Sequence, residues 1–300
     1  MKKRILFVFI IICFLFLFGC QSIEKDHSHQ EEPGENEVVD EAINFLVLGI
    51  DSRGEAKSRT DTIMLVNYRP EDRTLKLISI MRDSYVQIPG HKHNFDKINN
   101  AYFLGGEELL KETIQNNFGL DVDHTITVDF QGFVSVVDTL IPEGIKVHVD
   151  QAIIDDMNLE MTAGINTLHG EDLLKYVRFR HDERSDFGRV ERQQTVLLDV
   201  IDKMNEQVNS FIGMTKIPHL VHHTIKNVET DLSPQEMITL SSMVFSQPIE
   251  QIETMRIPVK DGFTNQTYDH AGAVLELNFL KNQEAMQRFL SEPTPVSDGP

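Results

Sequence analysis

From residue 43 onward, short apolar runs alternate with longer segments of helical periodicity, and this alternation is the strongest constraint on the fold. The runs at 44–50, 62–67 and 75–80 have the length and the apolar content of buried strands. The segments at 130–140 and 188–208 have the length of helices, and the first places apolar residues on one face. Such alternation predicts a single layered α/β domain with a mixed central β-sheet flanked by helices.

The remaining elements follow from turn and cap residues. The turn chemistry of residues 69–73 predicts a hairpin between the second and third strands. Gly119 after Phe118 predicts the end of a helix, and Ser233 with Glu236 forms a capping box for a helix that reaches about residue 245. We further expect helices at 107–117 and 170–179 and strands at 125–128, 144–149 and 252–257.

Composition limits the function classes. The chain has 300 residues, and without a second linker we expect one domain over 43–290 followed by a flexible tail at 291–300. Cys13 and Cys20 are the only cysteines, so thiol catalysis, a cysteine zinc site and a disulfide framework are excluded from the domain. The net charge of −19 argues against nucleic-acid binding.

The N-terminus predicts export. Three basic residues precede an apolar run at 5–18, which is shorter than the about 20 residues of a spanning helix. Leu17–Cys20 resembles a lipobox, so residues 1–20 are either a lipoprotein-type signal peptide or a signal anchor. Residues 21–42 are strongly acidic and predict a disordered linker. Either alternative tethers the domain to the outer face of the cytoplasmic membrane.

Arginine is concentrated in one segment. Five of the 13 arginines fall within residues 178–192 of an otherwise acidic chain. The guanidinium group suits phosphate oxygens, so one interpretation is an anion pocket for a phosphate or diphosphate. The alternative is a salt-bridge network with the acidic residues of the same segment. The arginines are Arg178, Arg180, Arg184, Arg189 and Arg192, and the acidic residues are Asp182, Glu183, Asp186 and Glu191.

A second group of charges lies at the ends of the first three strands. Asp51 follows the first strand, Arg59 and Asp61 open the second, and Arg82 with Asp83 follows the third. Ligand sites of α/β sheets favour such strand ends. Two carboxylates on adjacent strand ends can share Mg²⁺, which completes its shell with phosphate oxygens and water. Taken alone, the segment Asp51–Arg53 after the first strand is better interpreted as a structural turn.

Three groups of histidines have weaker alternatives. His219, His222 and His223 have a spacing that can bind zinc on a helix, but no recognised motif accompanies them. His91 and His93 lie in a loop near the expected site, as surface residues or as substrate contacts. His27 and His29 belong to the acidic linker, where we favour a solvated tail over a metal site.

A series of short blocks follows one another along the chain: Leu48–Arg53 (LGIDSR), Ser58–Thr62 (SRTDT), Ser79–Asp83 (SIMRD), Lys97–Asn99 (KIN), Gly105–Gly106 (GG), Phe130–Phe133 (FQGF), Leu168–Glu171 (LHGE), Tyr176–His181 (YVRFRH) and Asp186–Gln194 (DFGRVERQQ). In this order, and over about residues 44–203, the chain resembles the LytR-CpsA-Psr family. Met81 replaces the proline that is usual in the family and His169 replaces a common asparagine, and neither is a charged position.

The resemblance implies an extracytoplasmic phosphotransferase, mostly of Gram-positive bacteria. It would move a glycopolymer, such as a teichoic acid, from an undecaprenyl-diphosphate carrier to peptidoglycan, with the isoprenoid in a hydrophobic channel between the sheet and the helices. On the matching positions, Asp51 and Asp61 would bind Mg²⁺. Arg82 and Asp83 are the candidate catalytic residues, with Asp83 as the base. The candidate diphosphate-binding residues are Arg59, Arg82, Arg178, Arg180, Arg189, Arg192, Gln193 and Gln194.

Two other functions fit the same residues. A polyprenyl-diphosphate pyrophosphohydrolase would use water where the transferase uses a sugar hydroxyl. A non-catalytic envelope protein would bind a polyprenyl phosphate without turnover or metal. Nucleotide hydrolysis is disfavoured because the sequence has no Walker-type phosphate loop.

Overall fold

The computed structural model describes residues 42–51, 60–182, 184–208, 228–233, 235–237, 239–240, 243 and 249–292. The strands are β1 (Ile43–Ile50), β2 (Thr60–Arg69), β3 (Thr74–Ile80), β4 (Ser84–Gln87), β5 (Phe95–Lys97), β6 (His124–Asp129), β7 (Ile145–Val149), β8 (Gly164–Leu168), β9 (Val228–Thr230), β10 (Gln251–Ile257), β11 (Phe263–Tyr268) and β12 (Gly272–Leu277). The helices are α2 (Ile98–Phe118), α3 (Phe130–Leu140), α4 (Gln151–Met157), α5 (Gly170–Arg178), α6 (Ser185–Val208) and α9 (Phe279–Ser291).

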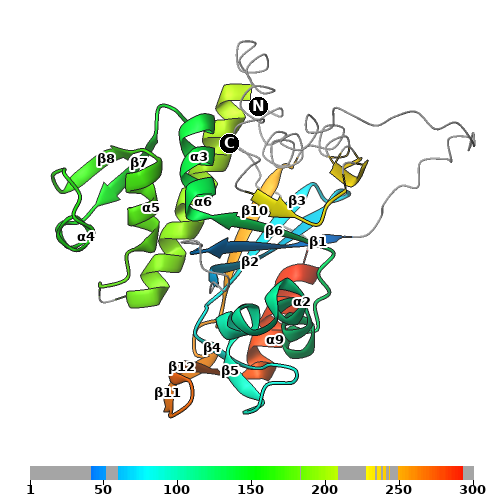
Figure 1. Ribbon diagram of the computed structural model, residues 1–300. Helices are drawn as coiled ribbons and strands as arrows, with labels where there is room; N and C mark the ends of the chain where they lie inside the picture. Colours follow the sequence, from blue (N-terminus) through cyan, green and yellow to red (C-terminus); the bar gives the residue numbers. More distant parts are fainter. Residues whose placement is uncertain are drawn as a thin grey trace, which may run out of the picture.

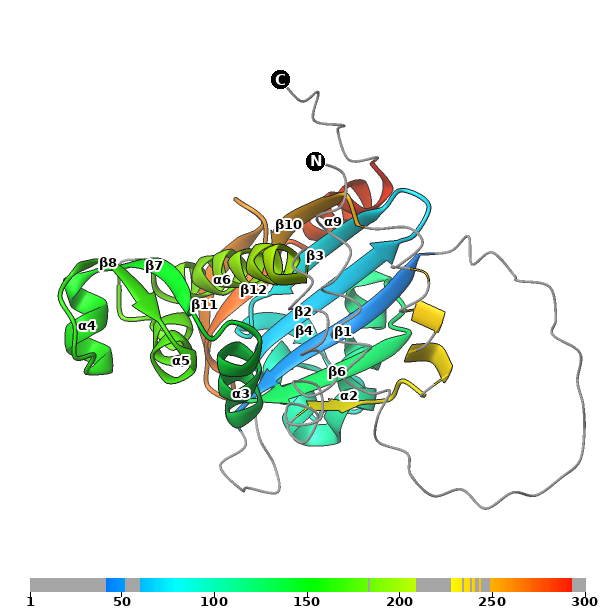
Figure 2. The same ribbon diagram turned by 90° about the horizontal axis from the view of Figure 1, so that it is seen from above.

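A six-stranded mixed sheet in the order β10-β3-β2-β1-β6-β9 forms the centre of the domain (Figure 2). β1 is parallel to β6 and β3 is parallel to β10, whereas β2 runs antiparallel between β1 and β3. The strands β1, β3, β6 and β10 therefore end at one edge of the sheet, where β2 begins. This confirms the expected α/β class with a mixed sheet flanked by helices.

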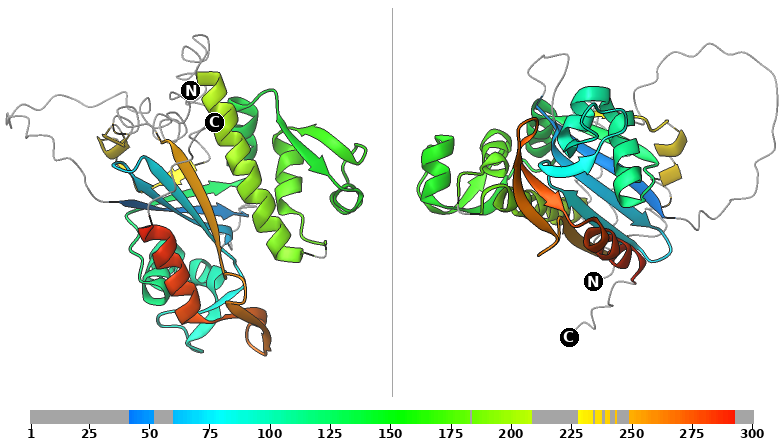
Figure 3. Two further views of the ribbon diagram at one scale, coloured as in Figure 1. Left: turned by 180° about the vertical axis from the view of Figure 1, so that it is seen from behind. Right: turned by 90° about the horizontal axis from the view of Figure 1, so that it is seen from below.

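The two faces of the sheet bury different clusters, because successive residues of a strand point to opposite sides. In β1, Leu46 and Leu48 face the cluster that α2 and α9 complete. Phe45 and Val47 face the other side, where they pack with residues 232, 237 and 240 of the segment after β9. Figures 1 and 3 show α2 and α9 together on one side of the sheet and α3 with α6 on the other.

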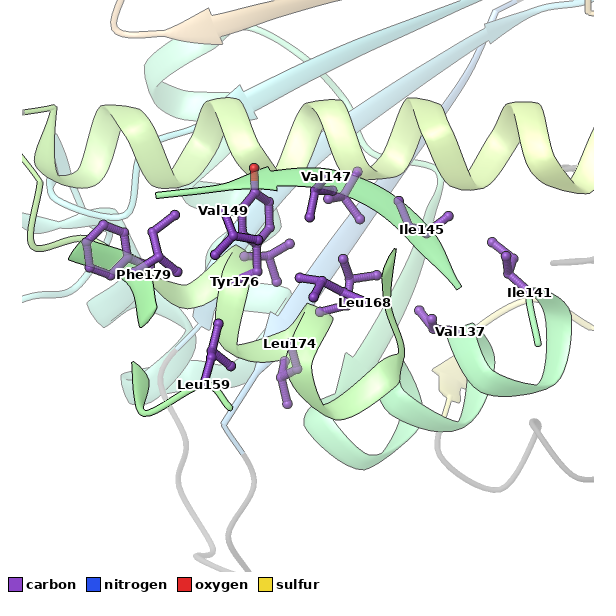
Figure 4. Close-up of a cluster of buried hydrophobic side chains, with 14 of the residues drawn as sticks. Val137, Ile141, Ile145, Val147, Val149, Leu159, Leu168, Leu174, Tyr176 and Phe179 are labelled. Atoms are coloured by element: carbon purple, nitrogen blue, oxygen red, sulfur yellow. The ribbon is translucent and has the colours of Figure 1, made fainter. Parts of the chain in front are cut away.

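A separate lobe packs against α6. Side chains of α3, α5, β7 and β8 meet those of α6 in one apolar cluster, which includes Val137, Val147, Leu168 and Tyr176 (Figure 4). β7 and β8 pair only with each other, in an antiparallel ribbon, so burial against α5 and α6 stabilises it. This lobe fixes the position of α6, which carries part of the arginine-rich segment.

A second sheet in the order β11-β12-β4-β5 lies beyond α2 and α9 (Figure 1). β11 with β12 and β4 with β5 are antiparallel hairpins, and β12 runs parallel to β4. β4 begins one residue after Asp83, and β5 leads directly into α2. The second sheet is thus connected directly to the edge of the central sheet.

Several local predictions are confirmed. β2 and β3 form the expected hairpin, and α3 has the predicted bounds. Gly119 ends α2 with a φ of 68°, in the left-handed region that glycine adopts without strain. The capping box is present, since the backbone N–H of Ser233 donates to Glu236 at 2.7 Å and that of Glu236 to the Ser233 hydroxyl at 3.3 Å.

Other elements differ from the prediction. The helix expected at 107–117 is the second part of α2, which begins at Ile98 and changes direction where Gly105 and Gly106 have non-helical dihedral angles. The strands of the second sheet were not predicted, because β5 has only three residues and β11 is mostly polar on both faces. The helix α9 was not predicted either, and it extends into the expected C-terminal tail as far as Ser291.

The expected signal segment, the acidic linker, Arg59, the histidines at 27, 29, 219, 222 and 223 and residues 293–300 lie outside the described residues. None of the helices within the described ranges combines the length and the apolar character that a membrane-spanning segment needs.

Lys76 is a buried cation in the middle of β3, with 1% of its side chain exposed. Its ammonium group donates to the backbone carbonyls of Phe289 and Glu292, both at 2.5 Å, at the C-terminal end of α9. Helix C-termini carry unsatisfied carbonyls and partial negative charge, so the ammonium group caps the helix. Lys76 thereby ties the last helix to a central strand.

We expect Lys76→Met to lower the free energy of unfolding by about 1–3 kcal/mol, because it leaves two partly buried carbonyls at the end of α9 without this donor. Urea unfolding followed by circular dichroism measures the change. Lys146→Met, on an exposed position of β7, is the matched control and should change stability little. A Lys76→Met variant as stable as the wild type would show that the cost of burying the ammonium group cancels its hydrogen bonds.

Candidate functional site

Charged side chains gather at the edge where β1, β3, β6 and β10 end. Asp51 follows β1, Asp61 lies at the start of β2, and Arg82 with Asp83 follows β3. The first turn of α6 brings Asp186 and Arg189 to the same place. The structure therefore joins the two groups that the sequence predicts separately, the strand-end charges and the arginine-rich segment.

Asp61 owes its direction to an irregularity in the β1–β2 ladder. Gly49 pairs with Thr62 and Ile50 pairs with Thr60, so Asp61 has no partner opposite it. Such a β-bulge re-aims the side chain of the extra residue. A Cβ on Gly49 would lie only 3.0 Å from that of Thr62, so this close strand approach needs glycine.

Asp61 connects the two most buried cations of the site. Its carboxylate accepts a hydrogen bond from Arg82 and lies 3.7 Å from the guanidinium group of Arg189. The Arg82 side chain is 16% exposed and that of Arg189 only 4%. Burial alone would lower the pKa of Arg82, but the carboxylates of Asp61, Asp186 and Asp83 outweigh it and raise the pKa. Both guanidinium groups are thus held in place by shared carboxylates.

Asp186 is the second shared carboxylate. Arg189, one helical turn further along α6, donates to it at 3.0 Å, and the Nε atom of Arg82 lies 3.9 Å from it. Burial raises the pKa of Asp186 although Arg189 and Arg82 oppose the shift, and burial lowers the pKa of Arg189. The salt-bridge interpretation of this segment is therefore correct for Asp186, which pairs with Arg189 inside the site.

The Nε atoms of Arg82 and Arg189 are buried, and neither has a hydrogen-bond partner within the described part of the chain. A buried donor without an acceptor costs about 1–3 kcal/mol. Most buried polar groups in proteins have partners, so such atoms need an explanation. A ligand with oxygen acceptors at this edge provides one.

Asp83 is paired with Lys97, which was not among the site residues predicted from the sequence. The ammonium group of Lys97 at the end of β5 lies 2.7 Å from the Asp83 carboxylate, and Arg82 Nε lies 3.7 Å from it. Both Asp83 and Lys97 are 26% exposed. Lys97 opens a block that resembles the family, and that block was the only signal that could have found it.

Two further predicted arginines lie on the solvent side. Arg178 stacks on the ring of Phe130, with its guanidinium carbon 4.1 Å from the ring centre, and lies 3.9 Å from Asp51. Arg180 is exposed, close enough to Asp186 to favour its charged form, and has no ion pair among the described residues. Arg180 is thus an accessible cation beside the buried pair.

The remaining predicted residues are engaged elsewhere. Arg192 donates to Asp182 at 2.8 Å and to the carbonyl of Phe179, and its guanidinium group lies over the Phe179 ring. Gln193 reaches the carbonyl of Val177 at 3.4 Å. The amide of Gln194 donates to the hydroxyl of Ser79 and to the carbonyl of Met255, and so ties α6 to β3 and β10. These contacts position α6.

The carboxylates of Asp51 and Asp61 are the metal ligands that the sequence predicts. Among the described residues there is no group of three or more histidine, cysteine or acidic side chains that could hold a metal ion. Mg²⁺ needs only one or two carboxylates when phosphate oxygens and water complete its shell. The donor set of Asp51 and Asp61 fits that requirement, although Arg178 and Arg82 contact these carboxylates in the ligand-free chain.

The chain is an α/β protein, and the site at the edge of its central sheet combines buried guanidinium groups with carboxylates. A family model described as the LytR_cpsA_psr family matches residues 14–288, and the chain belongs to this family. The regulatory protein MsrR of Staphylococcus aureus is 35% identical over 255 residues, which are 84% of this chain and 76% of that protein. The polyisoprenyl-teichoic acid–peptidoglycan teichoic acid transferase TagU of Bacillus anthracis is 32% identical over 239 residues, 79% and 76% of the two chains.

Solved structures agree with the family. A structure of TagT bound to LIIa-WTA has a TM-score of 0.66 and 28% sequence identity, and the match covers 89% of this chain and 94% of that one. A structure of YwtF (TagT) with bound octaprenyl pyrophosphate lipid has a TM-score of 0.61 and 27% identity, with the same coverage. The fold is therefore that of the LytR-CpsA-Psr domain.

Two further ion pairs involve α6, Arg192–Asp182 and Arg184–Glu191. They differ in exposure, so we expect their loss to lower the stability of the fold by different amounts. Arg192 and Asp182 are 6% and 22% exposed, whereas Arg184 and Glu191 are 54% and 61% exposed. We expect Arg192→Met to destabilise the fold by about 1–3 kcal/mol, because it leaves the half-buried carboxylate of Asp182 and the carbonyl of Phe179 without this donor. Arg184→Met, the matched control, should cost less than about 1 kcal/mol. Thermal unfolding measures both, and equal losses would contradict a structural role for Arg192.

Proposed function

We propose that the chain is an extracytoplasmic phosphotransferase that moves a glycopolymer, such as a teichoic acid, from an undecaprenyl-diphosphate carrier to peptidoglycan. The observation that carries this proposal is the buried pair of Arg82 and Arg189, next to the Asp83–Lys97 pair. The Nε atoms of both arginines lack a hydrogen-bond acceptor within the ranges that the structure describes. Family membership, the transferase TagU and the lipid-bound TagT structure support the same chemistry.

Arg82, Arg189, Arg178 and Arg180 would bind the diphosphate. Guanidinium groups form paired hydrogen bonds with phosphate oxygens, and buried ones do so where water screens them least. When the diphosphate enters, its oxygens would take over contacts that Asp61, Asp186 and Asp51 make in the ligand-free chain. Arg59 fits the same role by its sequence position. Arg192 does not, because Asp182 and Phe179 already occupy its guanidinium group.

The isoprenoid chain would lie on the sheet face that α6 approaches. Val47 of β1, Val128 of β6 and Leu197 of α6 are half-buried apolar residues of the same cluster on this face. β1 and β6 both end at the charged edge, so the apolar face leads directly to the proposed diphosphate site. An amphiphilic donor, with an apolar isoprenoid chain and a charged diphosphate, matches an apolar face that leads to a cationic edge.

In the reaction, a hydroxyl group of the acceptor sugar attacks the phosphorus atom next to the glycopolymer. Asp83 accepts the hydroxyl proton, and Lys97 holds the Asp83 carboxylate in position at 2.7 Å. The bond to the bridging oxygen breaks, and polyprenyl phosphate leaves with the negative charge. Arg82 and Arg189 stabilise that charge, and transfers of this type depend mainly on such positioning and electrostatics.

Mg²⁺ would bind to Asp51 and Asp61 together with diphosphate oxygens. When bound, the ion supplies neutralisation of phosphate charge that the arginines alone do not complete. Residues 1–20 would hold the domain at the outer face of the cytoplasmic membrane, where the carrier lipid is embedded. A lipid-modified Cys20 and an uncleaved anchor differ in the mass of the mature N-terminus.

Product analysis tests the transferase against its alternatives. The purified domain is given a polyprenyl-diphosphate-linked glycopolymer with and without peptidoglycan. A transferase attaches the polymer to peptidoglycan and releases polyprenyl phosphate. Release of free polymer phosphate at an equal rate in both samples identifies a pyrophosphohydrolase, and binding without any release identifies a carrier-binding protein.

We expect Arg180→Ala to lower the transfer rate by about 100-fold or more, because it removes one charge that stabilises the departing phosphate. Labelled glycopolymer attached to peptidoglycan is the readout. Arg184→Ala is the matched control, since this exposed arginine pairs with Glu191 away from the site. Melting temperatures should be unchanged because neither side chain is buried. Equal rates for the two variants would remove Arg180 from the site.

Asp51→Asn is expected to raise the Mg²⁺ concentration for half-maximal transfer by about tenfold, because it removes one charged ligand. The measurement is a metal titration of the initial rate at saturating donor. Asp72→Asn, in the turn between β2 and β3, is the control. An unchanged titration for Asp51→Asn would exclude this residue as a metal ligand.

A further inference from the structure

The outer face of the second sheet carries a cluster of five rings, which we call the ring platform. It consists of Tyr85 of β4, Phe95 of β5, Tyr268 of β11, His93 of the loop before β5 and His270 of the β11–β12 turn. His93 and His270 are exposed, and the other three residues are partly exposed. The mechanism proposed above uses none of them.

The rings lie in stacked pairs. Tyr85 and Tyr268 are nearly parallel, with an interplanar angle of 15° and ring centres 4.6 Å apart. His93 and His270 stack at 22° and 4.3 Å. The hydroxyl of Tyr85 lies 3.2 Å from the Nε2 atom of His270, which also contacts the carbonyl of Phe95 at 3.1 Å. These contacts hold the five rings in fixed orientations, although the rings do not belong to the buried apolar core.

Strand register places the platform beside the candidate base. Tyr85 pairs with Lys97 across β4 and β5, and with Glu276 across β4 and β12, so all three share one face. The pairing of β11 with β12 adds Tyr268 to that face. Tyr85 is two residues from Asp83, or about 7 Å along an extended strand. The platform therefore begins next to the Asp83–Lys97 pair.

The chemistry of the platform favours an uncharged sugar chain. Tyrosine and histidine rings offer an apolar face with a polar edge, which matches the C–H face and the hydroxyl groups of a pyranose ring. Tyr268 donates to Glu276 at 2.9 Å, so this carboxylate is an acceptor at the rim. Lost hydration and the neighbouring His270 lower the pKa of His93, which favours its uncharged ring.

Charge favours that choice over the other glycopolymer of the reaction. The carboxylate of Glu276 at the rim would repel the phosphates of a poly(alditol phosphate). Lys97, the cation that shares this face with Tyr85, is already paired with Asp83 at 2.7 Å.

We propose that the ring platform is the acceptor subsite, where the outer side of the stacked Tyr85–Tyr268 pair contacts an amino-sugar residue of the peptidoglycan glycan strand and directs its free hydroxyl group to Asp83. This inference rests on the proposed function, because it locates the acceptor of that reaction. It assigns Tyr268 and His270 a role in acceptor binding.

The test is direct binding of a soluble peptidoglycan oligosaccharide whose muramic acid carboxyl groups are amidated, so that the probe is uncharged. Binding is measured by isothermal titration calorimetry with the complete domain. We expect Tyr268→Ala to weaken binding by about tenfold, the effect of losing one stacked ring. Tyr268→Phe keeps the ring and should bind within about twofold of the wild type. Unchanged melting temperatures and unchanged binding of a polyprenyl diphosphate show that the variants are folded.

The outcomes separate this inference from the proposed function. Loss of oligosaccharide binding in Tyr268→Ala supports the subsite even if no transfer is detected with any acceptor. Wild-type protein that does not bind the oligosaccharide, or a Tyr268→Ala variant that binds it normally, overturns the subsite whether or not transfer occurs. A variant that loses affinity for soluble poly(glycerol phosphate) instead would assign the platform to the donor polymer and also overturn the proposal.

Discussion

Two carboxylates shared between two buried guanidinium groups determine the character of this site. Asp61 and Asp186 both contact Arg82 and Arg189, although the four residues come from β2, the end of β3 and α6. Such a pair of cations would repel each other without the acids. The arrangement keeps two guanidinium groups buried at the edge of the sheet, and the proposed diphosphate site depends on them.

The sheet direction explains why such distant residues meet. Four strands end at this edge, and three of them are followed directly by a residue that the site uses: Asp51 after β1, Arg82 after β3 and Phe130 after β6. The amide of Gln194 then fixes α6 to β3 and β10, which places Arg189 over the edge. Family membership and the TagU and TagT likenesses suggest the chemistry, but it is this topology that assembles the groups.

The strongly apolar strands and α3 could be predicted from sequence because their patterns are local. The candidate site could be predicted in part, since Asp51, Asp61, Arg82 and Arg189 stand at recognisable strand ends or in the arginine-rich segment. Arg192 could not be separated from Arg189 by spacing, because the orientation of each depends on the tertiary partners Asp182 and Asp61. Lys97 and the ring platform follow from the pairing of short strands, which leaves no periodic signal.

The cap that Lys76 provides for α9 couples the two ends of the domain. Lys76 donates to the carbonyls of Phe289 and Glu292, which are among the last residues that the structure describes. Its strand, β3, also pairs with β10. The first hairpin therefore cannot reach its native surroundings until β10 and α9, near the C-terminal end of the described chain, have been synthesised. Contacts of such long sequence separation favour slow, late consolidation of the sheet. Until then the apolar strands of the hairpin lack their neighbours, and folding depends on the chain remaining unaggregated.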